Sequence, residues 1–175
     1  MKQSNELERS ALRACAEFMA AAARTAPKTR GIDNIVVCVI NREAEVRTLA
    51  QAMRALFRKT GRPSLQRDAA TIEDLRHIVL LGVRRNPAGL NCGFCGYKDC
   101  AALAATRGIC AFNAIDLGIA TGSAVSVAAR CRIDNRIMYS IGRAAIASGV
   151  LGKGVAQALG IPLSVSGKSP FFDRK

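Results

Sequence analysis

The sequence predicts an α/β (α+β) protein in which a mixed sheet of a few short buried strands is covered by helices on both faces. Two observations lead to this prediction. Short, largely apolar runs occur at residues 35–40 (IVVCVI), 77–83 (HIVLLGV) and 161–166 (IPLSVS), which is typical of strands buried on both faces. Between these runs lie longer segments whose apolar residues recur at helical spacing, as expected when helices cover a sheet.

The predicted helices span residues 5–24, 43–58, 100–107, 111–130 and 135–149. The first carries its apolar residues on one stripe and has Ser4 or Asn5 as a capping residue. Gly61 and Pro63 end the second helix, because both residues interrupt helical structure. Segment 111–130 is rich in small residues, and the spacing of Gly118 and Gly122 would let another backbone or a flat ligand approach closely.

A chain of 175 residues is large enough to bury a core without covalent support, so we expect a single domain over residues 1–175. Acidic residues interrupt the N-terminal segment, which therefore does not resemble a signal peptide. No apolar run is both long and uncharged enough to predict a membrane span. We therefore expect a cytoplasmic protein without a membrane partner.

The chain is strongly basic, with 26 Lys and Arg against 13 Asp and Glu and a formal net charge of +13. Such a charge favours anionic partners. The arginines are scattered from Arg9 to Arg174 and form no basic run with interleaved aromatic residues, so we expect nucleic acid to bind only non-specifically. An acidic redox partner protein or an anionic small molecule is the expected partner. A basic nucleic-acid-binding protein with a structural zinc loop is the alternative.

Four cysteines lie in a loop predicted over residues 88–112, with the spacing Cys-x2-Cys-x4-Cys-x9-Cys: Cys92, Cys95, Cys100 and Cys110. Clustered thiolates suit zinc or an iron–sulfur cluster. Gly93 and Gly96 would let the loop wrap round a bulky cube and leave N–H groups free for its sulfurs. We therefore predict one [4Fe–4S] cluster on these four residues. Zinc and free reactive thiols are the alternatives, and Cys131 could replace Cys110 as the fourth ligand.

The remaining candidate residues are predicted to be structural. Cys15 lies on the apolar helix face and Cys38 lies within a strand, so both belong to the core. His77 opens a strand and is expected to be structural. No Ser/His/Asp set, paired carboxylates or phosphate-binding loop is visible, so the sequence offers no hydrolytic machinery. Electron transfer or redox chemistry is the predicted function, and if the protein is an enzyme we expect an oxidoreductase.

The segment NCGFCGYKDC resembles the four-iron loop of the Rnf electron-transport B subunit and of the corrinoid iron–sulfur proteins. The nine-residue gap before Cys110 is short for that pattern. Segments along nearly the whole chain, including TAPKTRGIDNIV, GLNCGFCGYKDC, DNRIMYSIG and GIPLSVSGKSPFFDR, are similar to an uncharacterised bacterial and archaeal family described as ferredoxin-domain-containing. This resemblance implies that the cluster is carried on Cys92, Cys95, Cys100 and Cys110.

The order of the predicted elements is also similar to the FMN-dependent nitroreductase fold in reduced form. That resemblance implies a flavin-dependent oxidoreductase with an accessory cluster as an alternative function. Asn34 would then lie near the flavin ring. Five basic residues would surround the FMN phosphate: Arg24, Lys28, Arg30, Lys168 and Arg174.

The small residues of segment 111–130 raise a further hypothesis, that the protein is a homodimer. Gly118, Gly122, Ala124 and Ala128 could let two helices approach closely at such an interface. The alternative is that this helix is the buried centre of a single subunit.

Overall fold

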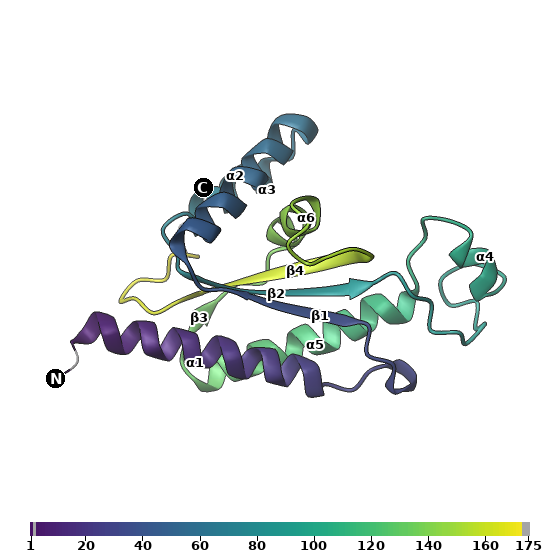
Figure 1. The fold of residues 1–175 in the computed structure, drawn as a ribbon, viewed down its shortest axis with the longest axis horizontal. Coiled ribbons are helices and arrows are strands. Elements are labelled where there is room, and N and C mark those ends of the chain that lie inside the picture. The colour runs from purple at the N-terminus through teal and green to yellow at the C-terminus, as the bar shows by residue number, and fades with distance from the viewer. Residues whose placement is uncertain (2, 173–175) are drawn as a thin grey trace.

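The structure is a computed structural model that describes residue 1 and residues 3–172. Figure 1 shows a central sheet with a layer of helices on each side and the segment around α4 projecting from one end. The elements are, in chain order, α1 (Ser4–Thr25), η1 (Thr29–Gly31), β1 (Ile35–Ile40), α2 (Glu43–Thr60), α3 (Pro63–Ile72), β2 (His77–Arg84), α4 (Cys100–Ala104), α5 (Ala111–Arg130), β3 (Asp134–Asn135), α6 (Tyr139–Ala147) and β4 (Val155–Ser164).

The sheet has four strands in the order β1-β2-β4-β3. Every neighbouring pair is antiparallel, so the sheet is not mixed as the sequence analysis expected. β3 pairs only with Leu163 and Ser164 of β4, and one further bridge joins Met138 to Gly160. Among the described residues, the outer edge of β4 before Gly160 therefore has no neighbouring strand.

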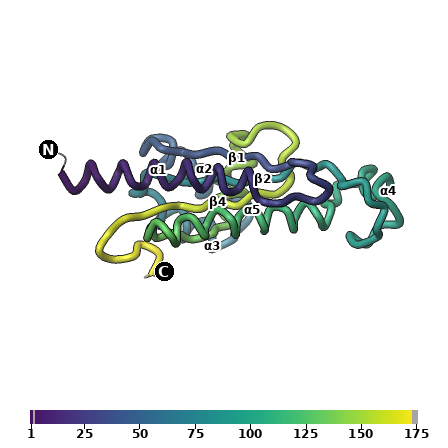
Figure 2. Tube along the Cα trace, turned by 90° about the horizontal axis from the view of Figure 1, so that it is seen from below, coloured from purple at the N-terminus to yellow at the C-terminus, as the bar shows by residue number. Residues whose placement is uncertain are grey.

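The two faces of the sheet carry separate apolar cores, as the alternation of side chains along a strand requires. Val79, Leu81 and Val83 of β2 pack with α1 and α5 on one face. Ile78 and Leu80 pack with α2, α3 and α6 on the other face. Figure 2 shows α1 and α5 lying side by side along the first face. The prediction that helices cover both faces is confirmed.

Several element boundaries differ from the prediction. Pro63, expected to end a helix, instead begins α3, because a proline at the first helical position loses no hydrogen bond. β4 begins at Val155, six residues before the expected strand, because pairing with β2 overrides the weak strand preference of its alanines. Asp134 and Asn135 pair with β4, so the helix expected over 135–149 begins only at Tyr139.

One helix of the described chain, α5, is long and apolar enough by length and composition to cross a membrane. Its inner face is buried: Leu117, Ala120, Ala124 and Ala128 belong to the core shared with α1 and the sheet. Its outer face carries Gly118 and Gly122, where an added Cβ would meet nothing within 4 Å. The small residues expected at a dimer contact are thus divided between the core and the surface.

Glycine is required where α6 crosses β4. A Cβ at Gly142 would lie 1.8 Å from the backbone oxygen of Ala158, and a Cβ at Gly160 would lie 2.1 Å from the Ile141 side chain. The helix and the strand therefore approach more closely than any larger residues at these two positions would allow. This contact fixes α6 beside the open edge of β4.

Candidate metal centre

Cys92, Cys95, Cys100 and Cys110 line one pocket between the end of β2 and the start of α5. Cys92 and Cys95 lie in the loop, Cys100 is the first residue of α4, and Cys110 is the residue that precedes α5. Cys92 is exposed, Cys95 and Cys100 are half-buried, and Cys110 is buried. Three chain segments thus bring four thiols to the same small volume of the protein.

The loop reaches this arrangement through left-handed backbone conformations. Gly93 and Gly96 have φ of 69° and 82°, and the N–H of Gly96 donates to the carbonyl of Gly93 at 2.8 Å. Asn91 has φ of 49°. Its N–H donates to Cys100 Sγ at 3.4 Å, while its Oδ1 accepts from the Cys100 N–H at 3.0 Å. A backbone N–H directed at a ligand sulfur is the kind of contact that tunes a metal centre.

The pocket is otherwise lined by apolar side chains. The rings of Phe94 and Phe112 lie 5.7 Å apart between centroids, and Ala88, Leu103 and Cys110 form a small buried cluster with Cys95 packed against it. The free volume of the pocket is about 10 Å³, roughly the space that one water molecule needs.

The donor set can be compared with the two kinds of centre that the sequence suggested. Among the described residues, no three His, Cys, Asp or Glu side chains converge closely enough to hold a single metal ion. A four-iron cube holds its thiolates further apart than one zinc ion does, and iron–sulfur clusters take four cysteines. Four thiols line one apolar pocket, and Asp99 is occupied in capping α4 through the N–H of Ala102, so the donors are thiolates alone, as iron–sulfur centres use.

A network of three asparagines supports the base of the cysteine loop. Asn113 of α5 is buried, and its amide donates to the carbonyls of Arg84 and Asn86 at 3.0 and 2.9 Å. Asn86 in turn donates to the side chain of Asn34 at 3.1 Å. Asn86 and Asn113 were not among the predicted site residues. Asn113 could have been found, because it is a polar residue in the first turn of an otherwise apolar helix.

The turn at residues 29–31 is also joined to this region. Thr29 donates through its N–H and its hydroxyl to Asp116 of α5, at 3.0 and 2.9 Å. Arg30 donates to the carbonyl of Ala88 at 2.9 Å. The turn therefore connects α1 to both the helix and the loop that carry the cysteines, and Arg30 supports the loop from outside.

The other cysteines lie away from the pocket. Cys131 follows the last residue of α5, so α5 separates it from Cys110 by about 30 Å at the helical rise. It lies instead beside Cys15, whose thiol pKa is raised to about 12 by burial and by Cys131. Burial also raises the pKa of the Cys38 thiol, with a smaller contribution from Glu45. The structure thus keeps Cys131 away from the other candidate ligands, and Cys15 in the core.

The residues expected round a flavin phosphate do not gather at one place. Arg24 forms an ion pair with Asp33, Lys28 donates to the carbonyl of Ala23 at 2.8 Å, and Arg30 holds the cysteine loop. Asn34 lies at the same end of the sheet, in the asparagine network. Lys168 follows β4 at the opposite end, and Arg174 lies outside the described residues.

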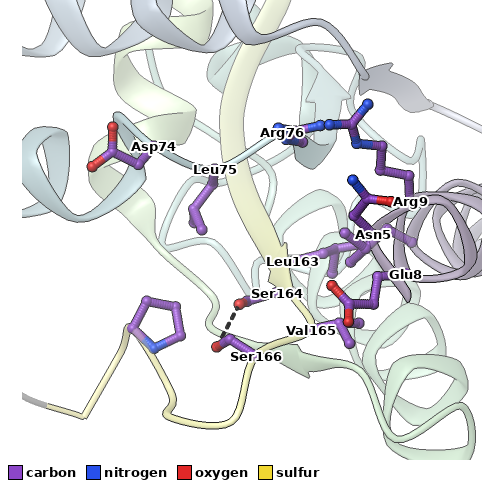
Figure 3. Close-up of a pocket in the computed structure, with 12 residues that line it drawn as sticks. Asn5, Glu8, Arg9, Asp74, Leu75, Arg76, Leu163, Ser164, Val165 and Ser166 are labelled. Atoms are coloured by element: carbon purple, nitrogen blue, oxygen red, sulfur yellow. Dashed lines mark hydrogen bonds between the residues drawn. The ribbon is translucent and has the colours of Figure 1, made fainter. Parts of the chain in front are cut away.

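Figure 3 shows the hollow at that opposite end, a cavity of about 350 Å³ between the start of α1, the chain before β2 and the end of β4. Its charges are mixed, with Glu8 and Asp74 as well as Arg9 and Arg76 on its walls. Ser164 and Ser166 lie 3.3 Å apart between their hydroxyl oxygens. Lys168 follows Ser166 along the chain, whereas Asn5 and Arg24 are separated by about 28 Å of helix. Arg24, near the end of α1, and Lys168, near its start, therefore lie too far apart to bind the same phosphate.

His77, the first residue of β2, is 5% exposed. Among the described residues its Nδ1 has no hydrogen-bond partner. Burial lowers the pKa of this imidazole, and the positive charges of Arg76 and Arg13 lower it further. The neutral form of this side chain is therefore favoured at the end of the sheet that lies opposite the cysteine pocket.

Comparison with known sequences identifies the family. A protein of Archaeoglobus fulgidus, described as an uncharacterized protein, is 39% identical over 178 residues, which cover 97% of this chain and 95% of the relative. A family model described as "uncharacterized protein containing a ferredoxin domain (DUF2148)" matches residues 106–174. The chain belongs to this family. The matched segment contains Cys110 and follows the other three cysteines of the pocket, so the family model alone does not cover the whole centre.

The fold is also that of the nitroreductases. A nitroreductase family protein from Clostridium novyi NT superposes with a TM-score of 0.62 at 12% identity, over 87% of this chain and 74% of that chain. The NADPH:FMN oxidoreductase of Vibrio harveyi, solved in complex with NAD+, gives a TM-score of 0.56 at 12% identity, over 89% of this chain. The match spans 60% of the Vibrio protein. The predicted α/β class and the resemblance to the nitroreductase fold are confirmed, whereas the sheet itself is antiparallel throughout.

Proposed function

We propose that the protein carries one [4Fe–4S] cluster on Cys92, Cys95, Cys100 and Cys110 and uses it in electron transfer or redox chemistry with a partner. The observation that carries the proposal is the convergence of four thiols from three chain segments on one apolar pocket. Membership of a family that contains a ferredoxin domain supports the same chemistry. When bound, the cluster would supply one-electron transfer.

The chain's own residues have distinct parts in this proposal. The thiols would bind iron, and Asn91 would orient Cys100 through its two hydrogen bonds. Cys110 precedes the first turn of the 20-residue helix α5, whose positive end stabilises an anionic group. Phe112 would shield the inner side of the pocket from water, while Phe94 stays largely exposed at its rim. Exclusion of water and N–H groups near the sulfurs both set a cluster's reduction potential.

The exposed rim of the pocket suggests where the partner would dock. Cys92 is exposed beside Phe94, which is 65% exposed, so one edge of the centre faces solvent. Lys98 and Arg107 lie in the same loop region and are exposed. An acidic redox protein would suit this basic, partly apolar rim. We propose the cytoplasm as the location, where thiols stay reduced.

A flavin-dependent oxidoreductase is the second candidate, supported by the fold shared with nitroreductases. The division of the expected phosphate ligands between the two ends of the sheet weighs against the particular set of residues assigned to FMN. Flavin bands in the visible spectrum of the purified protein, and release of FMN on denaturation, would favour this candidate over a simple electron carrier.

The metal proposal is tested by replacing Cys92, Cys95 or Cys100 singly with alanine and measuring iron and sulfide in protein purified without oxygen. Each variant is expected to lose most of its iron, because a cube that lacks one thiolate is not held. Cys38→Ala is the matched control, since that cysteine lies in β1, and it should keep wild-type iron content. Iron retained at the wild-type level in any of the three variants would refute the ligand set.

A further inference from the structure

A groove of about 500 Å³ lies between α5, α6 and the open edge of β4. Its volume is within the range of small-molecule sites. Ile109 and Ala114 lie on its wall, directly before Cys110 and about one helical turn after it. The groove therefore adjoins the cysteine pocket, although the two share no lining residue.

One wall of the groove is an unpaired strand edge. The N–H and C=O of Gly160 bond to Met138 on the side of β4 that faces away from β2. Because backbone groups alternate along a strand, Ala158 directs its own to the same side, where no described strand lies. α6 covers the oxygen of Ala158 through Gly142. The edge thus leaves the N–H of Ala158 without a strand partner beside the groove.

Of the polar side chains that line the groove, the Tyr139 hydroxyl is hydrogen-bonded to Ser64, which leaves Gln157 and Arg143 to meet a ligand. Gln157 Oε1 is buried and has no hydrogen-bond partner among the described residues. Arg143 is exposed on α6 and is the only charged residue that lines the groove; no ion pair involves it among residues 3–172. A guanidinium with no carboxylate beside it, above an apolar floor, favours a ligand that carries negative charge.

The opposite wall is shaped by a glycine. Gly118 of α5 lines the groove, and a Cβ there would meet nothing within 4 Å. Leu117 of α5 contributes apolar surface on the same side, and Leu159 of β4 adds apolar surface from the strand. The absence of a side chain at Gly118 leaves a flat wall opposite the strand edge. A flat ligand can lie against such a wall more closely than a branched one.

We propose that this groove binds a small planar organic acid, whose ring lies between Gly118 and the edge of β4 and whose carboxylate is bound by Arg143. A peptide added as a strand is disfavoured, because the edge is open only between the turn at Gly154 and the bridge at Gly160. The proposal is independent of the metal assignment, since no cysteine lines the groove.

The probe for this site is 2-naphthoate, with the uncharged 2-naphthamide as its matched control. Titration calorimetry on wild-type protein, purified without oxygen, should show one naphthoate per chain. Naphthamide should bind about tenfold more weakly, because it lacks the charge-assisted contact. Arg143→Gln should reduce naphthoate affinity by about the same factor and leave naphthamide affinity unchanged.

The wall is tested with Gly118→Leu, which should fill the groove and abolish binding of both molecules. Ala129→Leu is its control, because Ala129 lies further along α5, is exposed and does not line the groove. Equal affinity in Gly118→Leu and wild type, or no naphthoate binding at millimolar concentration, would overturn the proposal. If the wild-type protein contained iron but did not bind naphthoate, the ligand-binding proposal would be refuted and the metal proposal would stand.

Discussion

At the scale of single residues, a pair of variants can decide which cysteine is the fourth ligand of the centre. Cys110→Ala is expected to lose the cluster, because Cys110 lines the same pocket as the other three cysteines. Cys131→Ala should retain it, because that residue lies at the other end of α5 beside Cys15. Iron analysis of the two variants makes the comparison. If Cys131→Ala lost iron and Cys110→Ala kept it, the fourth ligand would be wrongly assigned.

His77 gives a pH-dependent contribution to stability. Burial, with Arg76 and Arg13 adding to it, lowers its pKa in the folded protein from the ordinary 6.5. The unfolded chain therefore binds the proton more readily, so this contribution is full above pH 6.5 and is lost as pH falls towards the folded pKa. Urea unfolding of wild type and His77→Gln at about pH 5 and 7.5 tests this. Parallel pH dependence in both proteins would contradict it.

Cysteine spacing is local information, so the sequence could single out four thiols that the structure places round one pocket; their role as ligands stays a prediction. The asparagine network was not predictable in the same way. Asn34, Asn86 and Asn113 come from three separate segments, and nothing in any one segment specifies the other two. Arg30 illustrates the same limit: its charge suggested a phosphate ligand, whereas its partner is the carbonyl of Ala88, which only the tertiary structure reveals.

At the scale of the elements, the contact of α6 with β4 depends on glycine. Gly142→Ala should lower the free energy of unfolding by about 3 kcal/mol, because its Cβ would overlap the Ala158 carbonyl. Gly118→Ala, in open surroundings on α5, should raise it by roughly 0.5–1 kcal/mol through helix propensity. Urea unfolding measures both. Equal stability of the two variants would show that the close approach is not maintained.

The elements with strong periodicity were the most predictable. The helix expected over 111–130 matches α5, and the strand expected at 35–40 matches β1. β4 was truncated in the prediction because Ala156, Gln157 and Ala158 have no strand preference of their own; pairing with β2 makes them a strand. α3 was missed because Pro63 was taken for a helix end, although proline is equally suited to a helix start.

At the scale of the whole molecule, the exposed strip of α5 leads to a prediction about association. Ile115, Ile119 and Gly122 lie on its outer face and do not line the groove, and an exposed apolar strip of this kind favours contact with another chain. We predict a homodimer in sedimentation experiments at micromolar concentration, and Gly122→Glu should dissociate it by placing charges at the contact. A wild-type protein that sediments as a monomer would exclude the dimer.

The net charge of +13 predicts polyanion binding without sequence preference. A bound cluster with four thiolates adds roughly −2, so the surface stays basic. Binding through about six phosphates should weaken ~10³-fold between 50 and 200 mM salt, because each contact releases counterions. Competition among several DNA and RNA molecules at about 150 mM salt checks this. One substrate preferred by a hundredfold would favour the nucleic-acid-binding alternative.

The iron and sulfide content of the wild-type protein, purified without oxygen from iron-replete cells, tests the central claim most directly. The account predicts about four iron and four sulfide atoms per chain, with a broad thiolate-to-iron absorption that bleaches on reduction. Stoichiometric zinc, or a protein free of metal under the same conditions, would contradict it.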